Sequence, residues 1–587
     1  MTSYTPPAAE MRFILKRVLK IERYADLPGF AALDEDVLDT ILDEAGRFCA
    51  EVIHPLNAVA DQAGCARAPD GSVTTPPGFP EAYAAYVEAG WGTLALPEEF
   101  GGQGMPHVLG TVVEEYLNSA CQGFTMYPGL THGAVGALLS KGSEALKAEY
   151  LPKLVSGEWL GTMALTEPQC GTDLGLIRTR AEPQADGCYR VSGEKIFCSG
   201  GEQDLTQNIV HLVLARTPDA PAGTRGLSLF VVPKVLPDGA RNAVVCGSVE
   251  HKMGLKGSAT CAMQFERATG SIVGGEGEGL AAMFVMMNAA RLSCGNQGLA
   301  QAELALQNAA TYALDRRQGR AAGSRAGGER AEADPIIVHP DVRRMLMDAR
   351  AFTQGLRALV LWTALQIDLS HGVEDAEHRR AADELVGFLT PVLKAYGTDE
   401  SFRTTIAMQQ VLGGHGYIAE WGMEQIVRDA RAAMLYEGAN GVQALDLAGR
   451  KLLRDKGATA RRFFDLVDAE CQGAPPEIAA GVHAATQDVR AAAEWLLAHG
   501  GADAEALGAG SYPFLEMVGI LAIGWMWARM ATVAAEDPED PFLAAKLVTA
   551  RHYVRRKLPF TAALRRQVET GPETLMALPA EAFLPAG

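Results

Sequence analysis

Apolar positions recur at helical spacing through the first part of the chain. Between residues 36 and 150 they fall repeatedly on one face of a 3.6-residue repeat, which predicts amphipathic helices. The positions that define two such faces are Val37, Leu38, Ile41, Leu42, Phe48 and Val52, and then Val112, Val113, Tyr116 and Leu117.

The pattern changes between Met163 and Val273, where short apolar runs replace the helical repeat. Glycine, proline, asparagine and aspartate separate these runs, a spacing typical of an antiparallel sandwich or barrel with few long helices. The runs expected to be strands are 189–191, 209–214, 227–232 and 244–245.

Helical spacing returns at Gly279 and continues to about Asp455. The stretch Gly319–Asp334, rich in Ala, Gly, Arg and Glu, predicts a mobile loop between two long helices. After Gly473-Ala474-Pro475-Pro476 we expect about three more helices. The last of them is basic through Lys546, Arg551, Arg555, Arg556 and Lys557.

We therefore predict a mainly α protein with a central β domain. Five segments follow from the pattern: an N-terminal extension (1–35), a helical domain (36–160), a β domain (161–275), a four-helix bundle (276–456) and an additional helical domain (457–587). This order of domains fits several families and by itself says little about function.

Composition narrows the class of protein. Apolar residues make up 48% of the 587 residues, which is typical of a globular chain. With 52 basic and 71 acidic residues the net charge is −19, which argues against binding nucleic acid through bulk charge. A local arginine cluster or a helix N-terminus still suits an anionic ligand.

Ten scattered cysteines form no CxxC pair and no His/Cys ladder, so we expect reduced, mostly buried thiols and no metal site. Residues 1–10 contain no apolar signal segment. The apolar run 517–528 is shorter than the ~20 residues of a membrane span and predicts a buried core helix. We expect a cytoplasmic protein with no membrane contact.

Two segments at the β domain carry groups that suit a flat ring and a phosphate. The first is 164–173, in which Thr166, Gly171 and Thr172 surround a turn. The second is 195–201, where Phe197 and Ser199 stand two apart, on one face of a regular strand. Taken alone, the first is more often a capped Pro/Gly turn and the second an ordinary core aromatic before a turn.

Two further segments lie in the second helical region. In 410–417 three glycines end a helix, and His415 has no partner at metal-ligand spacing, so it suits a solvated or capping role. In 436–443 Glu437 stands in a glycine-rich break, where a ligand that excluded water would make it a base. A lone glutamate before glycine is more often a solvated helix end. The Gly-rich 274–279 lacks a Rossmann arrangement and predicts a turn into a helix.

All of these segments occur together in the order found in the acyl-CoA dehydrogenase family, which the chain resembles over residues 36–455. The motifs that carry the resemblance are Gly90-Trp91 with 97–102, Thr166-Glu167-Pro168 with Gly171-Thr172-Asp173, 252–258, Gln410 with Gly413-Gly414, and Tyr436-Glu437-Gly438. The segment 252–258 resembles the strand that closes the β domain. The implied fold is a helical domain, a β-barrel or sandwich and a four-helix bundle.

The resemblance implies FAD held at a homodimer interface, an acyl-CoA substrate and an electron-transfer flavoprotein as electron acceptor. It assigns Glu437 as the catalytic base. It assigns Arg291, Ser258 and Gly438 to the substrate. The cofactor positions it implies are Thr166, Gly171, Thr172, Phe197, Ser199, Arg316, Gln318, Gln410 and Gly414.

Some relatives place the base on an earlier helix, at the position that is Ala290 here, so Glu437 alone remains. Two departures concern the adenine end of FAD: Gln318-Gly319-Arg320 replaces the usual aromatic-Gly pair, and Ala439 stands where the family often has threonine. Met286, Met287 and Met408 are candidates for the acyl slot, although methionine at helical spacing is more often core.

The N-terminal and C-terminal additions resemble a longer subgroup of the family. Its substrates include 3-methylthiopropionyl-CoA, an intermediate of dimethylsulfoniopropionate degradation, as well as ordinary short to long fatty acyl-CoAs. The basic C-terminal segment leaves open a non-catalytic, nucleic-acid-associated member of the fold. An oxidase that uses O₂ directly is a third alternative. The oligomer implied is a dimer or a dimer of dimers.

Overall fold

The computed structural model describes residues 2–322 and 333–585, so residues 323–332 of the expected loop lie outside the described part. The chain divides into two compact units. The first contains Ser3–Pro6 and Pro28–Ser293, and the second contains Pro7–Leu27 and Cys294 onward.

The first unit begins with helices, as the spacing over 36–150 predicted. Asp34 starts the first long helix by accepting a hydrogen bond from the Val37 amide at 2.8 Å, the usual role of an N-cap aspartate. The helices are α2 (Glu35–Phe48), α3 (Leu56–Ala63), α4 (Phe79–Glu88), α5 (His107–Lys141) and α6 (Glu144–Val155), with a small hairpin of β1 (Ala66–Arg67) and β2 (Val73–Thr74).

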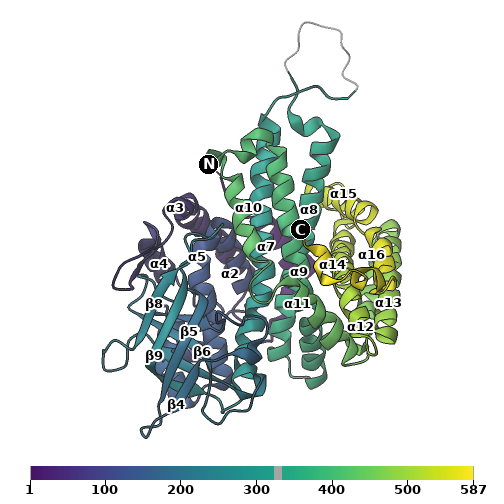
Figure 1. Cartoon of the computed structure of the whole chain (residues 1–587). Helices are drawn as coiled ribbons and strands as arrows, with labels where there is room; N and C mark the ends of the chain where they lie inside the picture. The colour runs from purple at the N-terminus through teal and green to yellow at the C-terminus, as the bar shows by residue number, and fades with distance from the viewer. Residues whose placement is uncertain (1, 323–332, 586–587) are drawn as a thin grey trace. The chain divides into compact units, whose positions relative to one another are not determined.

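A seven-stranded sheet follows and closes on itself. Strand β6 pairs with β4 and β7, and β9 joins β5 to β7, so five strands form a ring. Figure 1 shows several of these strands as neighbouring arrows. The strands are β3 (Trp159–Ala164), β4 (Arg180–Pro183), β5 (Tyr189–Ser199), β6 (Asn208–Arg216), β7 (Leu227–Pro233), β8 (Val244–Val249) and β9 (Thr260–Val273).

Two details of the β domain differ from the sequence prediction. The sheet is mixed and not purely antiparallel, because β3 and β4 each run parallel to β6. The segment 252–258 is a loop before β9 and not a strand. Leu255 there has a φ of +50°, and the Ser258 amide turns back to the Leu255 carbonyl at 3.0 Å, which is the geometry of a turn and not of a regular strand.

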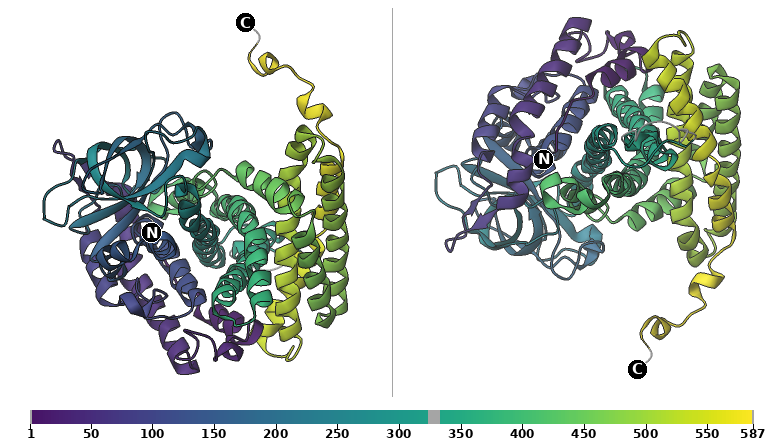
Figure 2. Two further views of the ribbon diagram at one scale, coloured as in Figure 1. Left: turned by 90° about the horizontal axis from the view of Figure 1, so that it is seen from below. Right: turned by 90° about the horizontal axis from the view of Figure 1, so that it is seen from above.

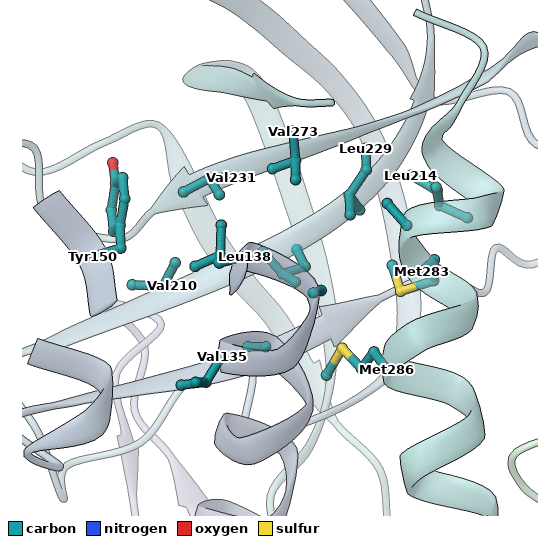
Figure 3. Close-up of a cluster of buried hydrophobic side chains, with 14 of the residues drawn as sticks. Val135, Leu138, Tyr150, Val210, Leu214, Leu229, Val231, Val273, Met283 and Met286 are labelled. Carbon is teal, nitrogen blue, oxygen red and sulfur yellow. The ribbon is translucent and has the colours of Figure 1, made fainter. Parts of the chain in front are cut away.

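The barrel packs on the helices of its own unit through one apolar cluster (Figure 3). Leu138 of α5, Tyr150 of α6 and Val210 of β6 belong to it. So do Met283 and Met286 of α7 (Gly279–Asp315). A Cβ on Gly133 would lie 2.7 Å from the Met286 side chain. Met286 is therefore core of the first unit, the alternative that its helical spacing left open.

The second unit is helical throughout its described part. Its central pair, α8 (Pro340–Gly372) and α9 (Ala376–Val411), are joined by three residues and lie side by side. Arg357 of α8 forms a buried ion pair with Glu303 of α7 at 2.9 Å. The remaining helices here are α1 (Ala8–Arg12), α10 (Met423–Ala432), α11 (Asn440–Leu445) and α12 (Ala458–Glu470).

More helices follow Pro475 than the three that the sequence predicted. In the described part they are α13 (Pro476–His499), α14 (Ala504–Ala534), α15 (Pro541–Arg556), α16 (Phe560–Glu569) and the short α17 (Glu573–Met576). The last residues leave this bundle as a tail (Figure 2). By length and composition α14 could cross a membrane, but 67% of its apolar window is buried, as in a core helix.

The basic residues near the C-terminus pair with acidic side chains of the second unit. Lys546 bonds to both Glu10 carboxylate oxygens, and Arg555 bonds to Glu477. Lys557 lies 3.4 Å from Glu400. The basic helix therefore packs on acidic neighbours of its own unit. The ten cysteines are reduced thiols and eight are buried, as expected.

Candidate active site

A tight turn at the end of β3 presents the first group of predicted site residues. The amides of Glu167 and Cys170 each bond to the other residue's carbonyl, at 2.9 and 3.0 Å. Thr166 is half-buried before this turn, and Thr172 is exposed after it. A Cβ on Gly171 would lie 3.5 Å from the Thr166 methyl group, so the two ends of the loop are close.

A buried ion pair beneath this loop holds it in place, and the sequence analysis did not single it out. Lys195 Nζ donates to Glu167 Oε1 at 2.8 Å and to the Leu165 carbonyl at 3.0 Å. Burial alone would raise the pKa of Glu167, but the charge and hydrogen bonds of Lys195, with bonds from Thr179 and the Arg178 amide, lower that pKa to about 2. The carboxylate is thus a fixed anchor for the loop that carries Thr166.

Phe197 projects from a β-bulge in β5. The register between β5 and β9 shifts between Lys195 and Cys198, and Phe197 has a φ of +56°. Its ring is 60% exposed, which is uncommon for an aromatic in a barrel strand. The Ile196 amide bonds to the Thr166 carbonyl at 2.8 Å, so this bulge and the Thr166 loop are joined.

The bulge corrects one sequence inference. A regular strand would place Phe197 and Ser199 on one face. Phe197 itself has the left-handed φ and lies between the paired residues Lys195 and Cys198, so it breaks that alternation. Ser199 pairs with Thr260 at the end of β5 and is half-buried.

Two predicted substrate residues also lie in the first unit. Ser258 is 2% exposed, and its Oγ has no hydrogen-bond partner among the described residues. Its carbonyl accepts a hydrogen bond from Lys252 at 2.7 Å. Arg291 of α7 is buried, lies over the Phe284 ring at 5.9 Å and contacts Asn288 at 3.4 Å.

Four predicted cofactor residues lie at two helix ends of the second unit. Arg316 and Gln318 follow α7 and are exposed. A short bridge to residues 334–336 holds their backbone. Gln410, in the last turn of α9, and Gly414 are exposed, and a Cβ on Gly414 would meet nothing within 4 Å.

At the glycine-rich end of α9, His415 has a different environment from the one that the sequence predicted. His415 stacks on Trp421 with ring centroids 4.6 Å apart. Its Nδ1 is hydrogen-bonded to the Tyr312 hydroxyl at 2.9 Å. The ring is therefore held on both sides by its own unit, and a solvated or capping role is wrong.

Glu437 stands where the sequence predicted, in the break between α10 and α11. It is half-buried and has a φ of +55°, in the left-handed region that glutamate rarely adopts. Gly438 follows with a φ of +84°. Strain of this kind persists only where the surroundings fix it, and it concentrates at functional sites.

Three side chains to which the sequence analysis gave no role fix this turn. Tyr436 donates to Gln297 at 2.5 Å. Gln443 donates from Nε2 to the Glu437 carbonyl at 3.0 Å, and Asn440 of α11 donates to Asp399 at 2.7 Å. The only signal in the sequence was that amide side chains stand three and six residues after Glu437.

The predicted residues therefore form two groups. The first unit contains Thr166, Gly171, Thr172, Phe197, Ser199, Ser258 and Arg291. The second unit contains Arg316, Gln318, Gln410, Gly414, Glu437 and Gly438. Within the first group the Thr166 loop and the Phe197 bulge are bonded to each other, and within the second Glu437 and Gly438 share one turn.

Four family models match successive parts of the chain. They are the acyl-CoA dehydrogenase N-terminal domain (36–158), middle domain (162–268) and C-terminal domain (277–452), and the acetyl-CoA dehydrogenase C-terminal-like domain (463–579). The chain is 43% identical to 3-methylmercaptopropionyl-CoA dehydrogenase of Ruegeria pomeroyi, over 98% of this chain and 100% of that one.

The chain belongs to the acyl-CoA dehydrogenase family. It is also 34% identical to a broad-specificity linear acyl-CoA dehydrogenase of Mycobacterium tuberculosis, over 99% and 100% of the two chains. The fold is that of Caenorhabditis elegans ACDH-11 in complex with C11-CoA. The TM-score is 0.77 at 18% identity, with 100% of this chain and 96% of that chain covered.

Membership of the family gives the class of reaction and the cofactor. This acyl-CoA dehydrogenase is an FAD-dependent oxidoreductase that acts on acyl-CoA thioesters. The helical, β and helical domains of the family and its extra C-terminal domain are all present, as the sequence predicted.

Proposed function

We propose that this acyl-CoA dehydrogenase oxidises 3-methylthiopropionyl-CoA or a similarly short acyl-CoA between Cα and Cβ, with Glu437 as the base. The observation that carries the role of Glu437 is its position on a left-handed, glycine-flanked turn that Gln443 holds by the backbone. The substrate class is supported by the relative from Ruegeria pomeroyi, which matches from end to end. This chemistry belongs to dimethylsulfoniopropionate degradation.

The residues of the first unit suit FAD. Phe197 offers an exposed aromatic ring for stacking, and the exposed Thr172 offers a hydroxyl for the pyrophosphate. Thr166 and Ser199 supply half-buried hydroxyls for the edge of the flavin ring, and Gly171 keeps the backbone of the loop accessible. When bound, FAD supplies the acceptor for the hydride that leaves Cβ.

We assign Arg316, Gln318, Gln410 and Gly414 to the FAD of a neighbouring subunit. All four are exposed at the ends of α7 and α9. Beyond them Tyr417 is 84% exposed, and Ile418 and Trp421 are also exposed. An exposed apolar group of this kind is typical of an interface between proteins. We therefore infer a homodimer or a dimer of dimers, for which sedimentation velocity is the direct test.

The substrate contacts follow from the chemistry of the thioester. Glu437 takes the proton from Cα, and the electron pair of that C–H bond becomes part of the new double bond. The backbone N–H of Glu437 stabilises the charge that develops on the thioester oxygen. Gly438 lets the Gln443 amide approach the turn that carries the base, because a Cβ there would lie 2.7 Å from Gln443 Nε2, and we assign Gly438 to the substrate site with it. The hydroxyl of buried Ser258, which bonds to none of the described residues, and the guanidinium of Arg291 are donors for the CoA thioester.

Water exclusion supports the same assignment. An acyl chain that covers Glu437 removes the water that stabilises the carboxylate, which makes it a stronger base. The product is a trans-2-enoyl-CoA. We propose an electron-transfer flavoprotein as the electron acceptor and the cytoplasm as the location, both by analogy with the family.

A general linear acyl-CoA dehydrogenase is the second reading of the same site. It is favoured by the full-length relative from Mycobacterium tuberculosis, whose name states a broad specificity. A panel of acyl-CoAs decides between the two readings, because the preferred chain is the one that reduces the enzyme fastest.

The direct test is anaerobic bleaching of the flavin absorbance by the acyl-CoA panel, with wild type, Glu437→Gln and the control Glu374→Gln. Glu374 is exposed in the connection between α8 and α9. We expect rapid bleaching by 3-methylthiopropionyl-CoA in wild type and control, and a loss of more than about 10³-fold in Glu437→Gln, within the contribution of a general base. Full bleaching of Glu437→Gln would exclude this residue as the base.

Two other classes of function predict results that differ from those of a dehydrogenase. An oxidase would form peroxide at the rate of turnover in air. A nucleic-acid-associated protein would bind duplex DNA with a steep salt dependence. We expect no DNA binding, because the basic residues Lys546, Arg555 and Lys557 already pair with carboxylates. We expect no peroxide at the rate of turnover, because the chain belongs to a dehydrogenase family.

A further inference from the structure

The additional C-terminal domain reaches the segment that carries Glu437. Helix α14 of that domain contains Tyr512, whose hydroxyl donates to Asp399 Oδ2 on α9. The other carboxylate oxygen of Asp399 accepts from Asn440 Nδ2 at 2.7 Å. Asn440 is the first residue of α11 and stands three residues after Glu437.

Asn440 is held on every side. Its Nδ2 also lies 3.0 Å from the Thr398 hydroxyl oxygen and 3.2 Å from the Ala395 carbonyl, and its Oδ1 accepts from Lys394 Nζ at 2.7 Å. Asn440 and Asp399 are 6% and 4% exposed. In such a dry setting a lost partner leaves a buried polar group unsatisfied, so the network has one favourable arrangement.

The hydroxyl of Tyr512 stays a donor over the working range of the enzyme. Burial and the hydrogen bond to Asp399 raise the pKa of Tyr512 above its ordinary value. Asp399 therefore receives this bond throughout that range.

The two helices that exchange this bond are closely packed. A Cβ on Gly519 of α14 would lie 2.3 Å from the Tyr396 ring of α9. The glycine lets the backbone of α14 approach α9 three residues before Asp399 in the sequence. A side chain at 519 would push the helices apart and lengthen the Tyr512–Asp399 bond.

We propose that Tyr512, through Asp399 and Asn440, is a positioning residue for Glu437. The added domain then contributes to catalysis by fixing the N-terminal end of α11, while Gln443 fixes the turn from the other side. This inference rests on the proposed role of Glu437 as the base. It gives the C-terminal domain a function in the reaction itself.

The test removes one oxygen atom, in Tyr512→Phe. The matched control is Tyr553→Phe. The Tyr553 hydroxyl is also buried, donates to the Ile520 carbonyl at 3.0 Å and lies beside Tyr396 of α9, so this variant removes a buried hydroxyl near the same helices but outside the chain from Tyr512 through Asp399 to Asn440. The measurements are kcat, KM for the acyl-CoA, flavin content and the isotope effect of Cα-deuterated substrate on flavin reduction.

We expect Tyr512→Phe to lower kcat about tenfold, since small displacements of a reacting group cost up to ~10²-fold. KM should stay within about twofold and flavin content should be unchanged, while the Cα isotope effect rises because proton removal becomes the slow step. Tyr553→Phe should keep the wild-type kcat and isotope effect. Asp399→Asn, which keeps the shape of the side chain, should reproduce the Tyr512→Phe profile.

Other results overturn the inference. If Tyr512→Phe keeps the wild-type kcat, or if its loss of kcat is matched by the Tyr553→Phe control or by a loss of flavin, Tyr512 has only a structural role. If Tyr512→Phe does not fold, Asp399→Asn decides by the same criteria. Glu437→Gln separates the two failures. If it retains proton abstraction, the proposed base is wrong. If it is inactive while Tyr512→Phe is normal, only the positioning role is wrong.

Discussion

The Nε2 group of Gln443 lies 3.0 Å from the carbonyl oxygen of Glu437 and 3.4 Å from that of Gly438. Gln443 is completely buried, one helical turn into α11. One amide therefore holds two consecutive residues of a turn in which both have positive φ. Because the carboxylate of Glu437 has to meet a specific proton, the backbone that carries it has to be fixed.

Replacing Gln443 with methionine should lower kcat with little change in KM. Methionine keeps the length of the side chain but donates no hydrogen bond, so the turn loses its restraint. The expected loss of unfolding free energy is about 1 kcal/mol, and kcat should fall about tenfold. Steady-state kinetics and urea unfolding measure the two effects.

A control for that variant is Gln307→Met, which removes an amide donor to Glu303 in α7. It should lower stability by a similar amount and leave kcat unchanged. Equal kinetics in the two variants would show that the Gln443 bond is only structural.

Replacing Phe197 with alanine should weaken flavin retention and leave the apoprotein fold intact. The ring is 60% exposed, so its loss should change the unfolding free energy by no more than about 0.5 kcal/mol. Flavin content after gel filtration and apoprotein melting temperature measure the two quantities. Val245→Ala, also exposed on a barrel strand, is the control and should retain flavin.

The local position of Glu437 could be predicted from sequence because it depends on nearby glycines between two helical patterns. The bulge at Phe197 could not, because it depends on how β5 pairs with β9, about 65 residues later in the chain. The error at 252–258 has the same origin. Its motif was recognisable, but the turn at Leu255 depends on φ, which no apolar pattern reports.

The contacts that hold the site residues in place were the least predictable feature of the site. Tyr512 and Asp399 are 113 residues apart, and Lys195 and Glu167 are 28 apart. Neither pair has a periodic signature, since each is defined only by how helices or strands pack. The interpretation of the basic C-terminal helix needed the same information, because its acidic partners Glu10 and Glu477 lie elsewhere in the chain.

Breaking the Lys195–Glu167 pair should destabilise the first unit in a pH-dependent way. Glu167→Gln leaves Lys195 as a buried cation without its carboxylate, at a cost of ~3–5 kcal/mol. The wild-type pKa of about 2 for Glu167 lies below the ~4.3 of an unfolded glutamate. The carboxylate therefore stabilises the fold fully above pH ~4.3, and this contribution is lost as pH falls through 2.

Urea unfolding of wild type and Glu167→Gln between pH 6 and 2.5 measures this difference. The gap between the two proteins should be constant above pH 5 and narrow below it. A gap that stays constant down to pH 2.5 would mean that the carboxylate contributes no charge-dependent stability. Glu182→Gln is the control, since its partner Arg267 is exposed and the pair should contribute little.

Replacing Lys546 with methionine should detach the N-terminal segment from the added domain. Lys546 is buried and bonds to both carboxylate oxygens of Glu10. Its Nζ also lies 3.0 Å from Gln354 Oε1 and over the Phe13 and Phe542 rings, so water does not replace Glu10 as its partner. The single variant leaves the Glu10 carboxylate buried, which costs ~3–5 kcal/mol. The double variant Lys546→Met/Glu10→Gln should recover most of that loss. Limited proteolysis of the N-terminal segment, at sites before Leu27, should be faster in the single variant than in wild type, and should not be faster in the double variant. If the two are cut equally fast, the ion pair does not hold the segment.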